Sequence, residues 1–170
     1  MPSPLPQQIA DTIRELRAQY LAENRASSYY EINNGICDQF ADDAVKILER
    51  QFGESKLMFA IGSENFYRGE YDETWDGDLL RSYWGMEPPA SLSWLDLNNI
   101  NFGGHVWFVC DKRHYDAECP AGVDNFFDLP IFRRSIVLFL RKNGIECDDV
   151  VTDDVSYSPA KAGLSRRLSP

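Results

Sequence analysis

One cysteine lies where a helix is expected to begin. Cys37 follows the turn-forming run Asn33-Asn34-Gly35 and precedes apolar residues with helical spacing. The first turn of a helix presents unpaired N–H groups and the positive end of the helix dipole, and both favour thiolate over thiol. The same N–H groups could hold an oxyanion, and Gly35 would let a substrate backbone approach closely. These features predict a nucleophilic thiol at Cys37, although the adjacent carboxylate of Asp38 opposes thiolate formation.

A histidine supplies the second half of such a site. His105 begins a β-rich run directly after Gly103-Gly104, which leave its face uncluttered. A cysteine nucleophile needs an imidazole as general base, and the imidazole needs an orienting group. Asp116 and Glu118, on the next β-rich run, are the candidates. If Asp111-Lys112 form a two-residue turn, His105 lies opposite Glu118, whereas an earlier turn or a bulge would bring Asp116 opposite it. Strand pairing alone leaves both carboxylates open.

Helices and a β-hairpin are expected to position these residues. Apolar residues recur with helical spacing over about 5–24 and 37–51, and Gly53 suits the end of the second helix. A last helix is expected between Pro130 and Asn143-Gly144; a polar link is expected over 23–28 and a turn at Asn33-Asn34-Gly35. A short strand over 56–61 and a hairpin joining 105–110 to 114–118 complete the pattern. It predicts an α+β fold with helices packed on a small antiparallel sheet.

The domain organisation follows from length and local composition. The chain has 170 residues, and we expect one catalytic-type domain over 1–150 and a flexible tail over 151–170. Residues 63–100 form an inserted loop or cleft region that is rich in acidic residues and tryptophan. Trp75 and Trp84 of this insert, together with Trp107, are candidate substrate contacts. The acidity of the insert favours a basic or glutamine-bearing peptide or protein substrate.

Overall composition excludes several classes of protein. A content of 13% aromatic and 44% hydrophobic residues argues against disorder, and a net charge of −10 argues against binding to nucleic-acid phosphates. The sequence shows no leader-like N-terminus and no apolar run of membrane-spanning length, so we expect a cytoplasmic protein with no membrane association. In that compartment the four cysteines would be reduced.

A metal site is the alternative use of the cysteines and of the second histidine. Cys110, His114 and Cys119 could be grouped as zinc ligands, but their spacing matches no standard zinc motif. His114 flanks the expected turn and should be exposed to solvent. Cys110, Cys119 and Cys147 are expected to be packing or surface thiols. The sequence therefore predicts neither a metal nor a cofactor.

The order of the candidate residues resembles that of the papain-like and transglutaminase-like superfamily of cysteine enzymes. The resemblance is carried by residues 35–41, 104–107 and 115–118, about a fifth of the chain. It implies a papain-like core in which Cys37 is the nucleophile, His105 the general base and acid, and Asp116 the orienting residue. Asp116 is preferred to Glu118 because it follows an aromatic residue, Tyr115, as the third residue of that superfamily does.

Two positions depart from the papain pattern. Glu31 stands six residues before Cys37, where papain proteases carry an oxyanion-hole glutamine, and no Asn-Ser-Trp segment follows His105. Asn33, Asn34 or the N–H group of Cys37 would then have to serve the oxyanion. These departures disfavour ordinary endopeptidase activity.

Two classes of function remain. The first is a cysteine-dependent hydrolase or acyltransferase (a protease, isopeptidase, deamidase or transglutaminase-like enzyme) that acts on an amide or related acyl bond. The second is a non-enzymatic acidic binding or inhibitor protein that recognises a basic partner surface, as the charge of −10 suggests. A Cys37→Ala change should abolish the first function and leave the second intact.

Overall fold

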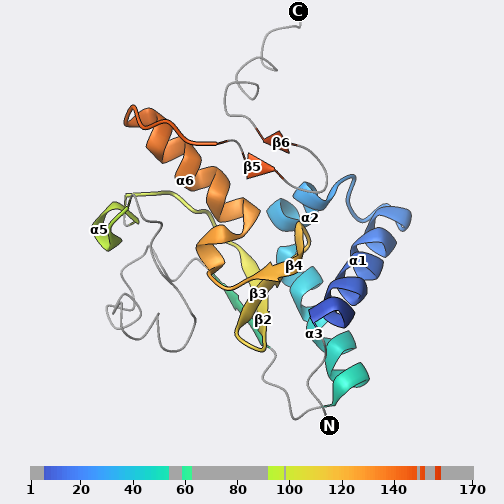
Figure 1. Ribbon diagram of the computed structural model, residues 1–170. Helices are drawn as coiled ribbons and strands as arrows, with labels where there is room; N and C mark the ends of the chain where they lie inside the picture. The colour runs from blue at the N-terminus through green and yellow to red at the C-terminus, as the bar shows by residue number, and fades with distance from the viewer. Residues whose placement is uncertain are drawn as a thin grey trace, which may run out of the picture.

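The computed structural model describes residues 6–53, 59–62, 92–97, 99–148, 150–151 and 156–157, and within them the fold is α+β (Figure 1). The elements run in the order α1 (Pro6–Ala22), α2 (Tyr29–Gly35), α3 (Cys37–Phe52), β1 (Phe59–Gly62), α5 (Trp94–Leu97), β2 (Val106–Cys110), β3 (Arg113–Asp116), β4 (Cys119–Val123), a short 3-10 helix (Phe126–Asp128), α6 (Pro130–Lys142), β5 (Val150–Val151) and β6 (Ser156–Tyr157). In Figure 1, α1 and α3 lie on one side of the main sheet and α6 lies on the other.

The main sheet is antiparallel with the strand order β1-β2-β3-β4. Its central hairpin turns at Asp111-Lys112, where both residues have positive φ (48° and 65°), as a two-residue hairpin turn of the favoured twist requires. Val109 therefore pairs with His114, and the register agrees with the hairpin expected from the sequence.

Alternate residues of β2 and β3 serve two separate apolar clusters, one on each face of the sheet. Phe108, Cys110 and Tyr115 pack with residues of α1, α2 and α3. Trp107 packs with the 3-10 helix, α5 and α6. The sheet is thus covered on both faces, and His105, directly before β2, contacts Trp107 and Phe132 of the second cluster.

The long helices agree with the helices expected from the sequence, but α2 was not expected. Residues 29–35 form a helix, so Asn33-Asn34-Gly35 end a helix rather than form the expected turn. The Ser28 hydroxyl accepts a hydrogen bond from the Glu31 N–H, and the Glu31 carboxylate accepts one from the Ser27 N–H. This reciprocal capping fixes the start of the helix. Burial of Ile32 stabilises it.

The expected second hairpin strand is too long. β3 ends at Asp116, and the chain reverses through Ala117 and Glu118 into β4, a strand that the sequence did not predict. The Asp116 carboxylate causes the reversal, because its Oδ1 accepts hydrogen bonds from the N–H groups of Glu118 (3.0 Å) and Cys119 (2.9 Å). The turn therefore removes Glu118 from the line of β3.

The expectation that His114 is exposed is wrong. Its side chain is fully buried, and its Nδ1 accepts a hydrogen bond of 3.0 Å from the indole N–H of Trp107. His114 occupies an inward-facing position of β3, where neighbouring aromatic rings exclude water.

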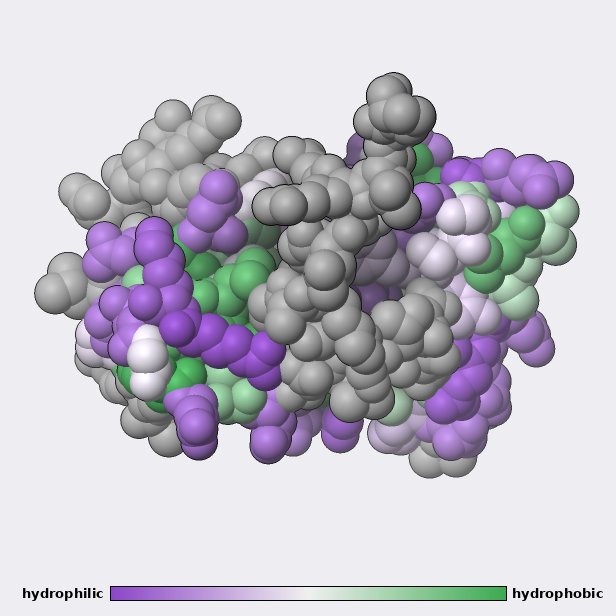
Figure 2. Space-filling view, turned by 90° about the horizontal axis from the view of Figure 1, so that it is seen from above, coloured by the Kyte–Doolittle hydropathy of each residue, from purple (hydrophilic) through white to green (hydrophobic). Residues whose placement is uncertain are grey.

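Parts of the predicted organisation lie outside the described residues. These include Trp75, Trp84, most of the 63–100 insert and most of the 151–170 segment. Seen from above, hydrophilic side chains cover much of the described surface, with smaller apolar areas between them (Figure 2). Among the described helices, none is both long and apolar enough to cross a membrane.

Candidate functional site

Cys37 is the first residue of α3 and is partly buried. Its Sγ accepts a hydrogen bond of 3.4 Å from the backbone N–H of Val106, the first residue of β2. Packing of α3 against β1 and β2 brings these two positions together although 69 residues separate them. The fold therefore holds the thiol at the junction of a helix start and a strand start.

His105 directly precedes β2 and is 1% exposed. Its Nε2 lies 3.2 Å from Oδ2 of Asp116, and Cys37 is near enough to the ring to raise the pKa of the imidazole. The ring stacks on Trp107 and contacts the edge of Phe132. Because Nε2 is held by the carboxylate, Nδ1 is the ring nitrogen that can exchange a proton with the thiol.

The electrostatics of the pair favour separated charges. Burial raises the pKa of the Cys37 thiol, but hydrogen bonds from His105 and the Val106 N–H, together with the positive charge of His105, outweigh it and lower the pKa overall. Burial alone would lower the pKa of His105, but the hydrogen bonds and negative charges of Asp116 and Cys37 raise it to about 9. The contacts therefore shift the pair toward a thiolate and an imidazolium.

Asp116, not Glu118, faces the imidazole. Its Oδ2 contacts His105, and its Oδ1 accepts the two backbone N–H groups of the turn, so both carboxylate oxygens are fixed. The side chain is 2% exposed. The acceptor of the imidazolium N–H is thus held in one orientation.

Glu118 has a different role, in an ion pair within the protein. Its carboxylate forms two hydrogen bonds with the Arg134 guanidinium, of 2.7 and 2.6 Å. The Asn33 amide donates to the same carboxylate (2.9 Å) and accepts from the Ala117 N–H (3.3 Å). Arg17 donates to the Ala117 carbonyl (3.0 Å). Side chains from α1, α2 and α6 therefore clamp the turn that presents Asp116.

The predicted oxyanion residues separate into two groups. Asn33 is 1% exposed and engaged with the turn, so its amide is used within the protein. Asn34 and Gly35 are exposed at the end of α2, and the Asn34 amide donates to the Tyr30 carbonyl. The first N–H groups of α3 remain candidate donors to an oxyanion, because the helical hydrogen bonds of α3 begin with Phe40.

The remaining predicted residues are placed as follows. Trp107 is fully buried beneath His105, so it supports the imidazole and has no surface to offer a substrate. Glu31, at the position of the papain glutamine, caps α2. Trp75 and Trp84 lie outside the described residues. Sequence reasoning did not identify Arg17, Arg134 or the Val106 N–H, because no local spacing links them to Cys37.

The proposed zinc ligands do not converge. Cys110 packs in the cluster beside α1 and α3, whereas His114 points to the Trp107 side of the sheet. Within the described part of the chain, no cluster of three or more His, Cys, Asp or Glu side chains could hold a metal ion. All four cysteines are free thiols.

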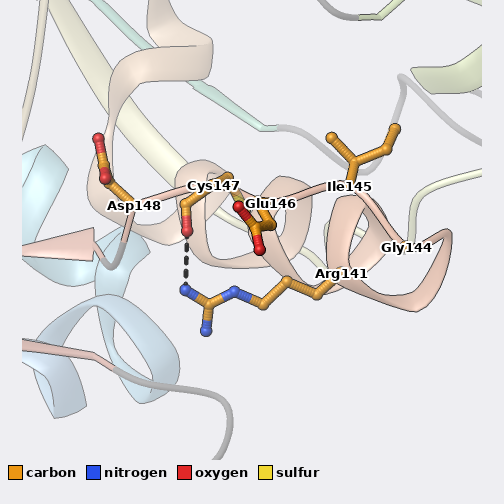
Figure 3. A pocket seen from close by; sticks show the side chains of 6 residues that line it. All are labelled: Arg141, Gly144, Ile145, Glu146, Cys147 and Asp148. Atoms are coloured by element: carbon orange, nitrogen blue, oxygen red, sulfur yellow. Dashed lines mark hydrogen bonds between the residues drawn. The ribbon is translucent and has the colours of Figure 1, made fainter.

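The structure also contains surface hollows. One of about 700 Å³ lies where α6 ends and is lined by residues 141 and 144–148; there Arg141 donates a hydrogen bond to the Cys147 carbonyl (Figure 3). It includes none of Cys37, His105 and Asp116. A second hollow, of about 380 Å³, is lined in part by Gly103 and Gly104, directly before His105.

Comparisons with known proteins add no family to this description. No family model matches the chain, and neither a curated protein nor a solved structure matches it. What the chain does is therefore inferred from the geometry of Cys37, His105 and Asp116.

Proposed function

We propose that this chain is a papain-like cysteine enzyme, a hydrolase or acyltransferase that acts on an amide or related acyl bond. The observation that carries the proposal is the juxtaposition of Cys37, His105 and Asp116: Asp116 holds Nε2 of His105 at 3.2 Å, and Cys37 and His105 interact closely enough that the pKa of Cys37 is lowered and that of His105 is raised. A helix start, a strand start and the end of the neighbouring antiparallel strand supply the three residues. This is the arrangement expected of a nucleophile, a base and an orienting group.

In the acylation half-reaction, the Cys37 thiolate attacks the substrate carbonyl carbon and forms a carbon–sulfur bond. The carbonyl oxygen becomes an oxyanion, which the N–H groups at the start of α3 stabilise. The His105 imidazolium then protonates the leaving amine as its bond to carbon breaks. The product is a thioester on Cys37 and a neutral imidazole.

In the second half-reaction, His105 removes a proton from water, which gives hydrolysis or deamidation, or from an amine, which gives transfer. The oxygen or nitrogen attacks the thioester carbon, and the thiolate leaves from the tetrahedral intermediate. The imidazolium is restored. Throughout, Asp116 holds the ring and stabilises its positive charge.

Site-resolved alkylation tests the proposal without a known substrate. Iodoacetamide reaction rates at Cys37 and Cys147 would be measured by mass spectrometry between pH 5 and 10, for the wild type and for His105→Ala. Because only the thiolate reacts, Cys37 should alkylate about tenfold or more faster than Cys147 at pH 6.5. In His105→Ala, the Cys37 pH midpoint should rise toward that of an ordinary thiol.

His114→Ala is the matched control, because both histidines are buried on the same side of the sheet and only His105 contacts Cys37. It should leave the Cys37 midpoint unchanged, with folding checked by circular dichroism. If Cys37 reacts no faster than Cys147 and His105→Ala has no effect, the enzyme proposal is wrong. A Cys37→Ala protein that kept its biological activity would then favour the acidic binding protein.

A further inference from the structure

A hollow beside the proposed site has the composition of a specificity pocket. It encloses about 380 Å³, within the range of roughly 300–1,000 Å³ of small-molecule sites. It is bounded by the end of α2, the loop before β2 and one side of α6. Its lining includes Tyr30, Asn34, Phe102, Ile131, Arg134 and Leu138.

Two residues that line the hollow lie close in sequence to the reacting residues. Gly104 is exposed and directly precedes His105, while Asn34 lies three residues before Cys37 on the segment that leads into α3. A substrate chain that extends from the Cys37 thiol along the Asn34 or Gly104 backbone would reach the lining of the hollow. The inference drawn from this position rests on the proposed function.

The charge in the hollow is already neutralised. Arg134 is the charged residue of its lining, and the Glu118 carboxylate pairs with the guanidinium through two hydrogen bonds. The paired side chains are 7% and 1% exposed, and the guanidinium also lies 4.7 Å from the centre of the Tyr30 ring. Among the described residues that line the hollow there is no carboxylate, so none of them offers a counter-ion to a bound lysine or arginine.

Apolar surface is concentrated at the same place. Tyr30, Leu138 and Ile145 are the large hydrophobic residues that stand exposed in the described part of the chain, and the first two border this hollow. Leu138 is 45% exposed. Phe102 and Ile131, which belong to the buried cluster under α6, form the apolar interior of the hollow. Covering these surfaces would stabilise a bound apolar side chain.

We infer that this hollow binds an uncharged, apolar side chain in the acyl part of the substrate, close to the scissile carbonyl. An ammonium group buried there without a partner would lose its hydration without compensation. The sequence favoured a basic substrate. If this inference holds, a basic side chain of that substrate would have to bind outside this hollow.

Peptidyl chloromethyl ketones provide the test. Their carbonyl lies at Cys37, and the thiolate displaces chloride to form a carbon–sulfur bond. Acetylated dipeptide probes would carry leucine, lysine or glutamate at either position, with glycine at the other. Labelling rates at Cys37 would be measured by mass spectrometry. At one of the two positions, the leucine probe should react at least tenfold faster than the lysine and glutamate probes.

Charged variants of Leu138 sharpen the test. Leu138→Glu should raise the lysine-to-leucine rate ratio at least fivefold, and Leu138→Lys should raise the glutamate-to-leucine ratio in the same way. Ile145→Glu is the matched control, because Ile145 is 43% exposed but borders the other hollow, where α6 ends (Figure 3). It should leave all ratios unchanged.

The two proposals fail in different ways. If iodoacetamide shows an activated Cys37 but the three probes react equally at both positions, or Leu138 variants change no ratio, the pocket assignment is overturned and the enzyme proposal stands. If iodoacetamide shows no activation that depends on His105, the enzyme proposal fails and the pocket assignment fails with it.

Discussion

At the residue scale, the charge state of the site depends on a few short contacts. Cys37 and His105 shift each other's pKa in opposite directions, so the thiolate and the imidazolium form together. The Asp116 carboxylate holds the second ring nitrogen and stabilises the cation. The negative charge of Asp38, which opposes thiolate formation, is the smallest of the contributions to the Cys37 pKa. The unfavourable effect of the Asp38 charge on the Cys37 thiolate is therefore outweighed by other contacts in the folded protein.

Asp116→Asn tests this coupling. The amide keeps the shape but loses the charge, so the His105 pKa should fall, the Cys37 pKa should rise, and alkylation of Cys37 at pH 6.5 should slow roughly tenfold. Because a partner of a buried charge is removed, the free energy of unfolding should fall by about 3 kcal/mol at pH 7. A Cys37 pH midpoint identical to that of the wild type would contradict the role assigned to Asp116.

The same residues set a pH dependence of stability. The pKa of His105 is raised from 6.5 to about 9 on folding, so its contribution is fully present below about pH 6.5 and is lost as pH rises through 9. In urea unfolding, the difference in unfolding free energy between wild type and His105→Ala should therefore be smaller at pH 10 than at pH 6. A difference that grows with pH would contradict the imidazolium assignment.

At the element scale, the turn between β3 and β4 decides which carboxylate serves the imidazole. If the pairing of β2 and β3 continued, position 118 would lie opposite His105. However, β3 ends at Asp116 and the turn directs Glu118 toward Arg134. The turn is held from three helices, through Arg17, Asn33 and Arg134. These contacts leave Asp116 little freedom to move away from the ring.

Gly122 tests how closely β4 must approach β3. It has φ +71°, and an added Cβ would lie 2.4 Å from a ring carbon of Tyr115. Gly122→Ala should therefore cost the left-handed strain of roughly 1–2 kcal/mol and a further roughly 1–3 kcal/mol of overpacking. Gly144→Ala is the control, because Gly144 has φ +75° and open space around its Cβ position. Equal losses in urea unfolding for the two variants would contradict the close packing.

The sequence predicted the elements whose cause is local. The apolar stripes of α1, α3 and α6, the end of α3 at Gly53 and the turn at Asp111-Lys112 all follow from nearby residues. β4 and the burial of His114 depend on partners distant in sequence or on a side-chain turn that spacing does not reveal. The capping of α2 by Ser28 and Glu31 could have been recognised, because serine followed three residues later by glutamate is a helix-start pattern.

The candidate site, too, could be predicted from the sequence only in part. The residue types and their order indicated Cys37, His105 and a carboxylate, but strand pairing could not choose between Asp116 and Glu118. That choice depends on where β3 ends. The Arg134–Glu118 pair joins residues of different elements, so only the three-dimensional structure shows that it supports the turn.

At the scale of the whole molecule, the site draws its residues from both sides of the sheet. Cys37 comes from a helix of the α1–α3 side, and His105 stacks against the cluster beneath α6. Neither cluster alone contains the complete site. The activated state of Cys37 is therefore a property of the assembled fold.

Partial denaturation tests this dependence. The ratio of Cys37 to Cys147 alkylation at pH 6.5, followed across a urea series, should fall to about one at the same midpoint as the far-ultraviolet circular dichroism signal. Coincident transitions are expected when both clusters unfold in one cooperative step. If the ratio of Cys37 to Cys147 alkylation fell to one at a clearly lower urea concentration than the circular dichroism midpoint, the site would open before the fold is lost.

The hydrogen bond between Trp107 and His114 has a consequence for how the protein buffers protons. An indole N–H can only donate, so Nδ1 of His114 carries a lone pair and the ring is neutral, with its proton on Nε2. His105, two residues before Trp107, is the cationic ring at neutral pH. The contacts of the two rings therefore favour different protonation states. Nitrogen-15 NMR at pH 7 should show one imidazolium and one Nε2–H tautomer.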